Sequence, residues 1–218
     1  MISTLRQKYT HLYGKNVNVE EMDDRFLSLT SNHKALFGKD KPMIFSASGR
    51  TEIAGNHTDH NLGLVIGASI NLDTIAAVTK RDDMIVNFCS EGFPKCTIDI
   101  SDLEIKEEEK NTTASLLRGV ARAFKDRGFD IKGFDANVTS KVLRGSGLSS
   151  SASVEVLIGE IFNSLYGDDS LSPVEIAKIG QYAENVYFGK PSGLLDQLSC
   201  AYGGIIGIDF ENKTEPKV

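Results

Sequence analysis

The glycine- and serine-rich stretch from Leu143 to Ser153 (LRGSGLSSSAS) constrains this chain more than any other part of its sequence. The residues before it, 133–140, alternate apolar and polar side chains, which predicts a half-buried strand. The residues after it, up to Gly167, carry apolar side chains at helical spacing. A glycine turn between a strand and a helix lets the backbone approach a ligand, and the helix N-terminus offers free N–H groups to an anion. The stretch therefore predicts an anion-binding loop, although a serine-capped helix after a glycine turn would have the same composition.

Two common phosphate-binding motifs do not fit this loop. A Walker A loop requires GxxxxGK[ST], and neither Gly189-Lys190-Pro191 nor any other Gly-Lys pair in the chain satisfies it. A dinucleotide fingerprint requires glycine where Ser150 stands. The interpretation that remains is a triphosphate held by backbone amides and serine hydroxyls, with a serine oxygen available for Mg²⁺.

The remaining pattern predicts an α+β domain, residues 41–218, preceded by a helical N-terminal segment, residues 1–40. We expect further strands, rich in β-branched residues, within 43–48, 65–80, 84–88, 97–100 and 205–210. We expect further helices over 112–128, 172–187 and 192–203, the second of which opens with the capping box Ser172-Pro173-Val174-Glu175.

Composition narrows the classes of function. The 218 residues are 40% hydrophobic and 25% charged, as in ordinary globular proteins, and no apolar run approaches the roughly 18 to 20 residues of a membrane span. The N-terminus lacks the order of a secretory signal, so we expect a cytoplasmic protein with no membrane partner. A net charge of −6 with scattered basic residues argues against nucleic acid as a partner, and the oligomeric state stays open. Cys89, Cys96 and Cys200 are expected to be reduced thiols.

A second polar cluster lies between Gly49 and Asn61 (GRTEIAGNHTDHN). Its charged, amide and imidazole side chains are Arg50, Glu52, Asn56, His57, Asp59 and His60. So dense a set of donors and acceptors suits a polyhydroxylated ligand such as a sugar. Zinc bound by His57, Asp59 and His60 is a weaker interpretation, because no distant further ligand is indicated. A plain polar loop is the third alternative.

The third cluster contains two carboxylates, Glu184 and Asp196, on two predicted helices joined by a bend that contains glycine and proline. Phosphoryl transfer to a hydroxyl uses one carboxylate that holds a metal ion and another near the nucleophilic oxygen. The pair suits that chemistry, although any acidic pair on surface helices would have the same pattern.

Together, the three segments resemble the GHMP kinase family and, within it, the galactokinases. Residues 49–61 resemble the signature GR-x-N-x-I-GEHTDYN, residues 145–152 resemble the phosphate loop G-x-GLSSSA, and residues 184–197 resemble E-N-x-x-x-G…CG-I-M-D-Q. Order and spacing agree over residues 43–210. The resemblance implies a fold of the ribosomal protein S5 domain 2-like type, with an active site closed by a second domain. It also implies ATP- and Mg²⁺-dependent phosphorylation of galactose at the C1 hydroxyl.

The resemblance also implies roles for single positions. Those matching residues around the ATP phosphates are Gly145, Gly147, Ser149 and Ser150. Those matching the Mg²⁺ ligands are Ser151 and Glu184. Asp196 matches the catalytic aspartate, and Arg50 matches the arginine beside it, which would stabilise charge on the sugar oxygen and the γ-phosphate. Those matching positions around the sugar are Asn56, His57, Asp59 and Gly193.

Several departures from the pattern bear on the substrate. Asn56 stands where galactokinases carry glutamate, His60 replaces a tyrosine and Ser192 replaces a cysteine. The chain reaches Val218 without a counterpart of the family's third, glycine-rich motif, so we expect a truncated chain with little or no activity of its own. The alternatives are a kinase for another C1-phosphorylated sugar (N-acetylgalactosamine, galacturonate or arabinose) and a non-catalytic sensor that binds galactose and ATP. A mevalonate-like kinase fits less well, because the polar cluster would then have no sugar to bind.

Overall fold

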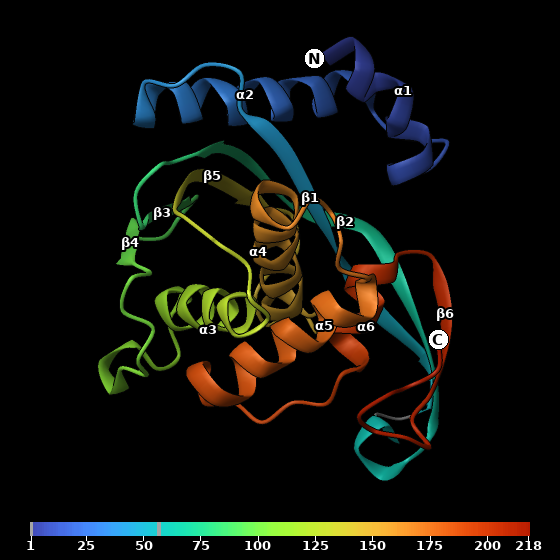
Figure 1. The fold of residues 1–218 in the computed structure, drawn as a ribbon. Coiled ribbons are helices and arrows are strands. Elements are labelled where there is room, and N and C mark those ends of the chain that lie inside the picture. Colours follow the sequence, from blue (N-terminus) through green and yellow to red (C-terminus); the bar gives the residue numbers. More distant parts are fainter. Residues whose placement is uncertain (1, 56–57) are drawn as a thin grey trace.

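A mixed sheet forms the centre of the molecule (Figure 1). The structure is a computed structural model, which describes residues 2–55 and 58–218. The strands are β1 (Met43–Ala54), β2 (Leu64–Lys80), β3 (Ile85–Ser90), β4 (Cys96–Asp99), β5 (Phe134–Ser140) and β6 (Ile205–Asp209). Their order is β1-β2-β5-β3-β4, and β6 pairs with the first part of β2. The β3–β5 pair is parallel, whereas the other pairs are antiparallel. The expected strands are all present, and β1 extends beyond its expected end.

Helices cover both faces of the sheet (Figure 1). They are α1 (Ile2–Tyr13), α2 (Val19–Phe37), α3 (Thr113–Asp126), α4 (Ser150–Tyr166), α5 (Pro173–Tyr182) and α6 (Leu195–Tyr202). Side chains alternate along β2, so Ile75 and Ala77 pack against α1 and α2, while Ala76 and Val78 join the core beneath α3 and α4. The expected α+β class is confirmed, and the N-terminal helices form one of its layers.

The helix ends follow their local sequences. Asn18 accepts a hydrogen bond from the Glu21 N–H at the start of α2, and Gly38 ends that helix in the left-handed region at φ 67°. The expected capping box at Ser172 is present, with both of its hydrogen bonds. Beyond α5 the helix continues as a π-helical turn, η3 (Ala183–Phe188), which shifts the register of the side chains that follow. Short 3₁₀ helices lie at η1 (Thr58–Asn61) and η2 (Glu107–Glu109).

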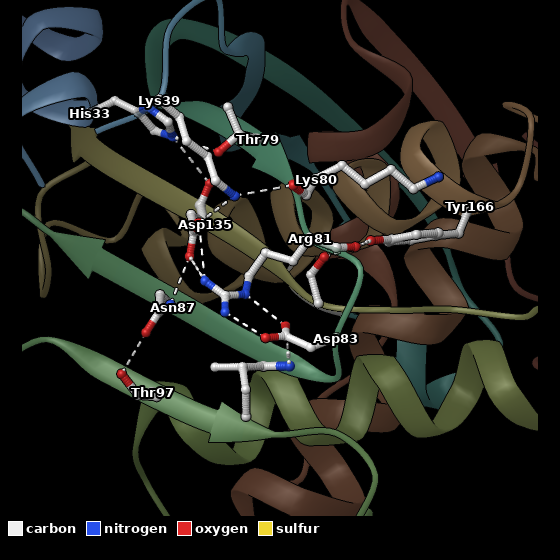
Figure 2. A network of polar contacts seen from close by, with 12 residues as sticks. His33, Lys39, Thr79, Lys80, Arg81, Asp83, Asn87, Thr97, Asp135 and Tyr166 are labelled. Atoms are coloured by element: carbon white, nitrogen blue, oxygen red, sulfur yellow. Dashed lines mark hydrogen bonds and ion pairs between the residues drawn. The ribbon is translucent and has the colours of Figure 1, made fainter. Parts of the chain in front are cut away.

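A buried polar network ties the layers together at the start of β5, the end of that strand remote from the glycine–serine loop (Figure 2). Asp135, 1% exposed, accepts hydrogen bonds from Asn87 (2.7 Å) and Arg81 (3.0 Å) and pairs with Lys39 (2.9 Å). Burial opposes ionisation of this carboxyl, but the bonds from Asn87, Lys39 and Arg81 hold the pKa of Asp135 below its usual range. The network therefore links elements of the fold to one another and leaves the buried carboxylate of Asp135 paired with positive charges.

Within residues 2–55 and 58–218, no helix combines the length and the apolar character needed to cross a bilayer. The three cysteines, Cys89, Cys96 and Cys200, are free thiols, as expected.

Candidate active site

The three sequence clusters meet at one cavity of about 260 Å³. Arg50 reaches it from β1, Asp196 from the first turn of α6, and the glycine–serine loop forms its wall. The Arg50 Nε donates a hydrogen bond to Asp196 Oδ1 (2.7 Å), and Nη1 donates to the Gly147 carbonyl (2.6 Å). The Ser149 hydroxyl donates to Asp196 Oδ2. Side chains from three distant stretches of sequence therefore contact one another directly.

Arg50 lies on a strand, where the sequence also allowed a plain polar loop. β1 continues through Ala54, with a register shift against β2 between Ser48 and Arg50. Such an irregularity re-aims the side chain that follows it. The Arg50 side chain is 9% exposed, whereas that of Asp196 is 30% exposed. A guanidinium so shielded, held at two of its nitrogens, is a fixed positive charge beside an accessible carboxylate.

Gly49, the neighbour of Arg50, has no room for a side chain. A Cβ there would lie 2.9 Å from both the Leu148 carbonyl oxygen and the Val142 Cγ1, and the Arg50 N–H already donates to that carbonyl (3.1 Å). We expect Gly49→Ala to lower the free energy of unfolding by about 1–3 kcal/mol, because strand and loop must separate to admit the methyl group. Urea unfolding measures this free energy. The control is Gly207→Ala on β6, where an added Cβ would meet nothing within 4 Å. Equal stability of both variants and the parent would show that the loop does not rest on Gly49.

The loop between β5 and α4 has the backbone expected of an anion-binding turn. Gly145 and Gly147 take φ values of 74° and 76°, which favour glycine, and Ser149 takes 57° at the position before α4. Ser149 does not cap the helix with its side chain, because its hydroxyl is bound to Asp196. The simple serine-capped helix is therefore not what the loop forms. The first bond into α4 runs from the Ser153 N–H to the Ser149 carbonyl (3.0 Å), so the N–H groups of residues 150–152 precede the helical ladder.

The second carboxylate, Glu184, lies on the π-helical turn and is 2% exposed. Its Oε1 accepts hydrogen bonds from the Ser151 hydroxyl (3.2 Å) and from Lys190 Nζ (3.0 Å). Its Oε2 accepts from Gln197 Nε2 (3.0 Å). The pairing of Ser151 with Glu184 places a carboxylate oxygen 3.2 Å from a hydroxyl that lines the cavity. These are the hard oxygen donors that Mg²⁺ prefers, and Mg²⁺ sites commonly use one or two carboxylates plus substrate phosphates.

Three further residues of the site did not emerge from the sequence. Gln197 Nε2 also donates to Glu155 Oε2 (2.9 Å), so one amide joins Glu155 and Glu184 inside the protein. Burial, followed by the charge of Glu184, raises the pKa of Glu155 well above its usual value. Lys190 lines the cavity beside the loop. In the sequence, Gln197 could have been found because it follows Asp196 directly, and Lys190 because it lies between Glu184 and Asp196. No feature of the sequence pointed to Glu155.

The sugar-contacting set is placed only in part. Asn56 and His57 lie outside the described residues, as does the side chain of Asp59, whose backbone belongs to η1. Gly193 lies in the turn before α6, three residues ahead of Asp196. The proposed contacts of these four residues with a sugar stay a prediction.

Two family descriptions, curated relatives and solved structures match this chain over the segments described above. The description "GHMP kinases N terminal domain" matches residues 115–204, and "Galactokinase galactose-binding signature" matches residues 31–80. The galactokinase of Clostridium tetani is 34% identical over 192 residues, which are 88% of this chain and 47% of that protein. The crystal structure of Lactococcus lactis galactokinase complexed with galactose has a TM-score of 0.80 at 31% identity, covering 88% of this chain and 50% of that one.

A more distant structure shares the fold alone. The Methanococcus jannaschii mevalonate kinase has a TM-score of 0.67 at 18% identity, covering 82% of this chain and 56% of that one. The chain spans about half the length of the curated relatives it matches. The glycine–serine loop, Glu184 and Asp196 fall in the first matched segment, and Arg50 falls in the second. The chain therefore carries an N-terminal GHMP kinase domain together with a galactokinase galactose-binding signature.

Proposed function

We propose that the protein is a galactokinase, which transfers the γ-phosphoryl group of ATP to the C1 hydroxyl of galactose. The observation that carries the proposal is the direct contact of Arg50 and Ser149 with the Asp196 carboxylate, beside the N-terminus of α4. A phosphate-binding helix start and an accessible carboxylate held by a cation are the parts that phosphoryl transfer to a hydroxyl needs. The match of residues 31–80 to the galactose-binding signature supports galactose as the acceptor.

Each group has a distinct task in the proposed reaction. The loop at Gly145, Gly147, Ser149 and Ser150 holds the phosphates of ATP through backbone N–H groups and hydroxyls. Ser151 and Glu184 would hold Mg²⁺, which when bound neutralises charge on the phosphate oxygens. Asp196 orients the sugar hydroxyl and accepts its proton, while Arg50 holds that carboxylate in position and faces the charge that develops during transfer. A loose transition state needs little base strength, so positioning is the larger part of the task.

Galactose is the substrate that we favour among the C1-phosphorylated sugars. Asn56, which stands where galactokinases carry glutamate, offers two donors and one acceptor in place of a carboxylate. This exchange favours no single sugar by itself, so N-acetylgalactosamine, galacturonate and arabinose are the competing acceptors. We place the reaction in the cytoplasm, where ATP is supplied.

The test is sugar-dependent consumption of ATP by the complete product of the gene that encodes this chain. We expect galactose to give the highest kcat/KM, with the other three sugars at least about tenfold lower, since one mismatched polar contact costs about 1–3 kcal/mol. A higher kcat/KM for another sugar would move the assignment to that kinase, and Asn56→Glu would then be expected to shift it toward galactose. Binding of galactose and ATP without consumption of ATP would identify a sensor.

A further inference from the structure

Lys190 is a cation of the cavity with no role in the reaction described above. Its side chain is 59% exposed, and its Nζ lies 3.0 Å from Glu184 Oε1, the same oxygen that accepts the Ser151 hydroxyl. Lys190 lines the cavity together with the loop serines and Asp196. Its ammonium therefore occupies the place beside Glu184 that a divalent cation would compete for.

The backbone of Lys190 is held in place, while its side chain can turn. The N–H groups of Gly189 and Lys190 both donate to the Glu184 carbonyl, at 3.0 and 3.2 Å. Two residues further on, the Ser192 N–H donates to Asn185 Oδ1 (2.7 Å). These bonds anchor the segment on both sides to the π-helical turn that carries Glu184. Because four carbons of flexible, largely exposed stem separate the anchored backbone from Nζ, the ammonium can exchange partners at low cost.

The charges in the cavity indicate the second partner. The Arg50 guanidinium is already held by Asp196 and the Gly147 carbonyl. Among the described residues that line the cavity, Lys190 supplies the ammonium group. Asp196 lines the same cavity, but its two oxygens already accept hydrogen bonds from Arg50 and Ser149. If Glu184 held Mg²⁺, the Lys190 ammonium would therefore be left to pair with a phosphate chain seated on the loop. A lysine acts there as a mobile point charge on terminal phosphate oxygens.

We propose that Lys190 is a nucleotide-binding residue: it pairs with Glu184 in this structure and would turn to the terminal phosphates of ATP when Glu184 holds Mg²⁺. The proposal rests on the proposed function, because it requires the loop to bind a triphosphate. A lysine ammonium carries its positive charge at neutral pH.

The first test is the Kd of MgATP, measured by calorimetry without sugar on the complete gene product. We expect Lys190→Met to weaken binding by about 10- to 100-fold, since a hydrogen bond to a charged group is lost, and Lys190→Arg to stay within a few-fold of the parent. Lys110→Met is the matched control: its Nζ pairs with Glu107 (2.7 Å) and its stem lies 3.7 Å from where a Cβ of Gly189 would be. It removes the same charge nearby without touching the cavity, and should leave Kd unchanged.

A second comparison separates contact with phosphate from simple neutralisation of Glu184. In a Glu184→Gln background, with ATP and EDTA, Lys190→Met should still weaken binding by about tenfold or more. A loss confined to the parent background would mean that Lys190 only offsets Glu184, which overturns the proposal. Equal Kd values for Lys190→Met and Lys110→Met would overturn it as well while leaving the proposed function intact. A parent protein that binds no ATP under either condition would overturn both.

Discussion

Replacing Asp196 by asparagine in the complete gene product is expected to lower kcat by about 10²- to 10⁴-fold, the range of positioned proton-transfer groups, while the Kd values of ATP and galactose change little. Asparagine keeps the shape of the side chain: its oxygen can accept from Arg50 Nε, and its amide can face Ser149, whose hydroxyl then accepts. What the variant loses is the ionised acceptor for the sugar proton. Steady-state kinetics with galactose and calorimetry of each ligand measure the two quantities separately.

Asp126→Asn is the matched control for Asp196→Asn, because Asp126 is also a carboxylate paired with an arginine, Arg122 (2.8 Å), but on the exposed side of α3. We expect its kcat to equal that of the parent. An unchanged kcat in Asp196→Asn would remove Asp196 from the reaction. A loss of sugar or ATP binding equal to the loss of kcat/KM would make Asp196 a binding residue only.

The parts of the site that could be predicted lie in short segments of unusual composition. Gly145, Gly147 and the serines after them predict a turn at the start of a helix, because glycine readily adopts the positive φ angles that this turn requires. Composition could not decide between capping and ligand binding. The decision depends on where the Ser149 hydroxyl points, and its partner Asp196 lies 47 residues away in the sequence.

The parts that could not be predicted depend on packing between distant elements. Glu155 stands between Val154 and Val156 on α4, and a carboxylate in a helix usually indicates its solvent face. The packing of α5, through Gly180, and of α6, which brings Gln197 to within 2.9 Å, buries it. Within β2, the consecutive apolar residues 75–78 were the only sign that helices cover both faces of the sheet, and this short run does not show which helices they are.

The same buried carboxyl leads to a prediction about stability. The pKa of Glu155 is raised well above its usual value, by burial first and by the charge of Glu184 second, whereas in the unfolded chain it titrates at about 4.3. Above that pH, the folded protein keeps a proton that the unfolded chain has released. The free energy of unfolding that this group contributes is therefore fully present below pH ~4.3 and falls by about 1.4 kcal/mol per pH unit until the folded pKa is passed. Glu155→Gln removes this dependence and should become the more stable protein as pH rises.

Urea unfolding at pH 5, 6, 7 and 8 measures the difference between Glu155→Gln and the parent. We expect this difference in the free energy of unfolding to grow with pH. The glutamine carbonyl at position 155 still accepts a hydrogen bond from Gln197 Nε2, and the variant has no carboxyl group at that position to titrate. Glu160 also has a raised pKa, through burial and then Asp169, and it contributes a slope of the same sign in both proteins, so the comparison cancels it. Glu108→Gln, the same chemical change on the exposed turn η2, should show no such trend. A difference that stays constant from pH 5 to 8 would mean that Glu155 is ionised in the folded protein, and its pairing with Gln197 and Glu184 would then have to hold two negative charges.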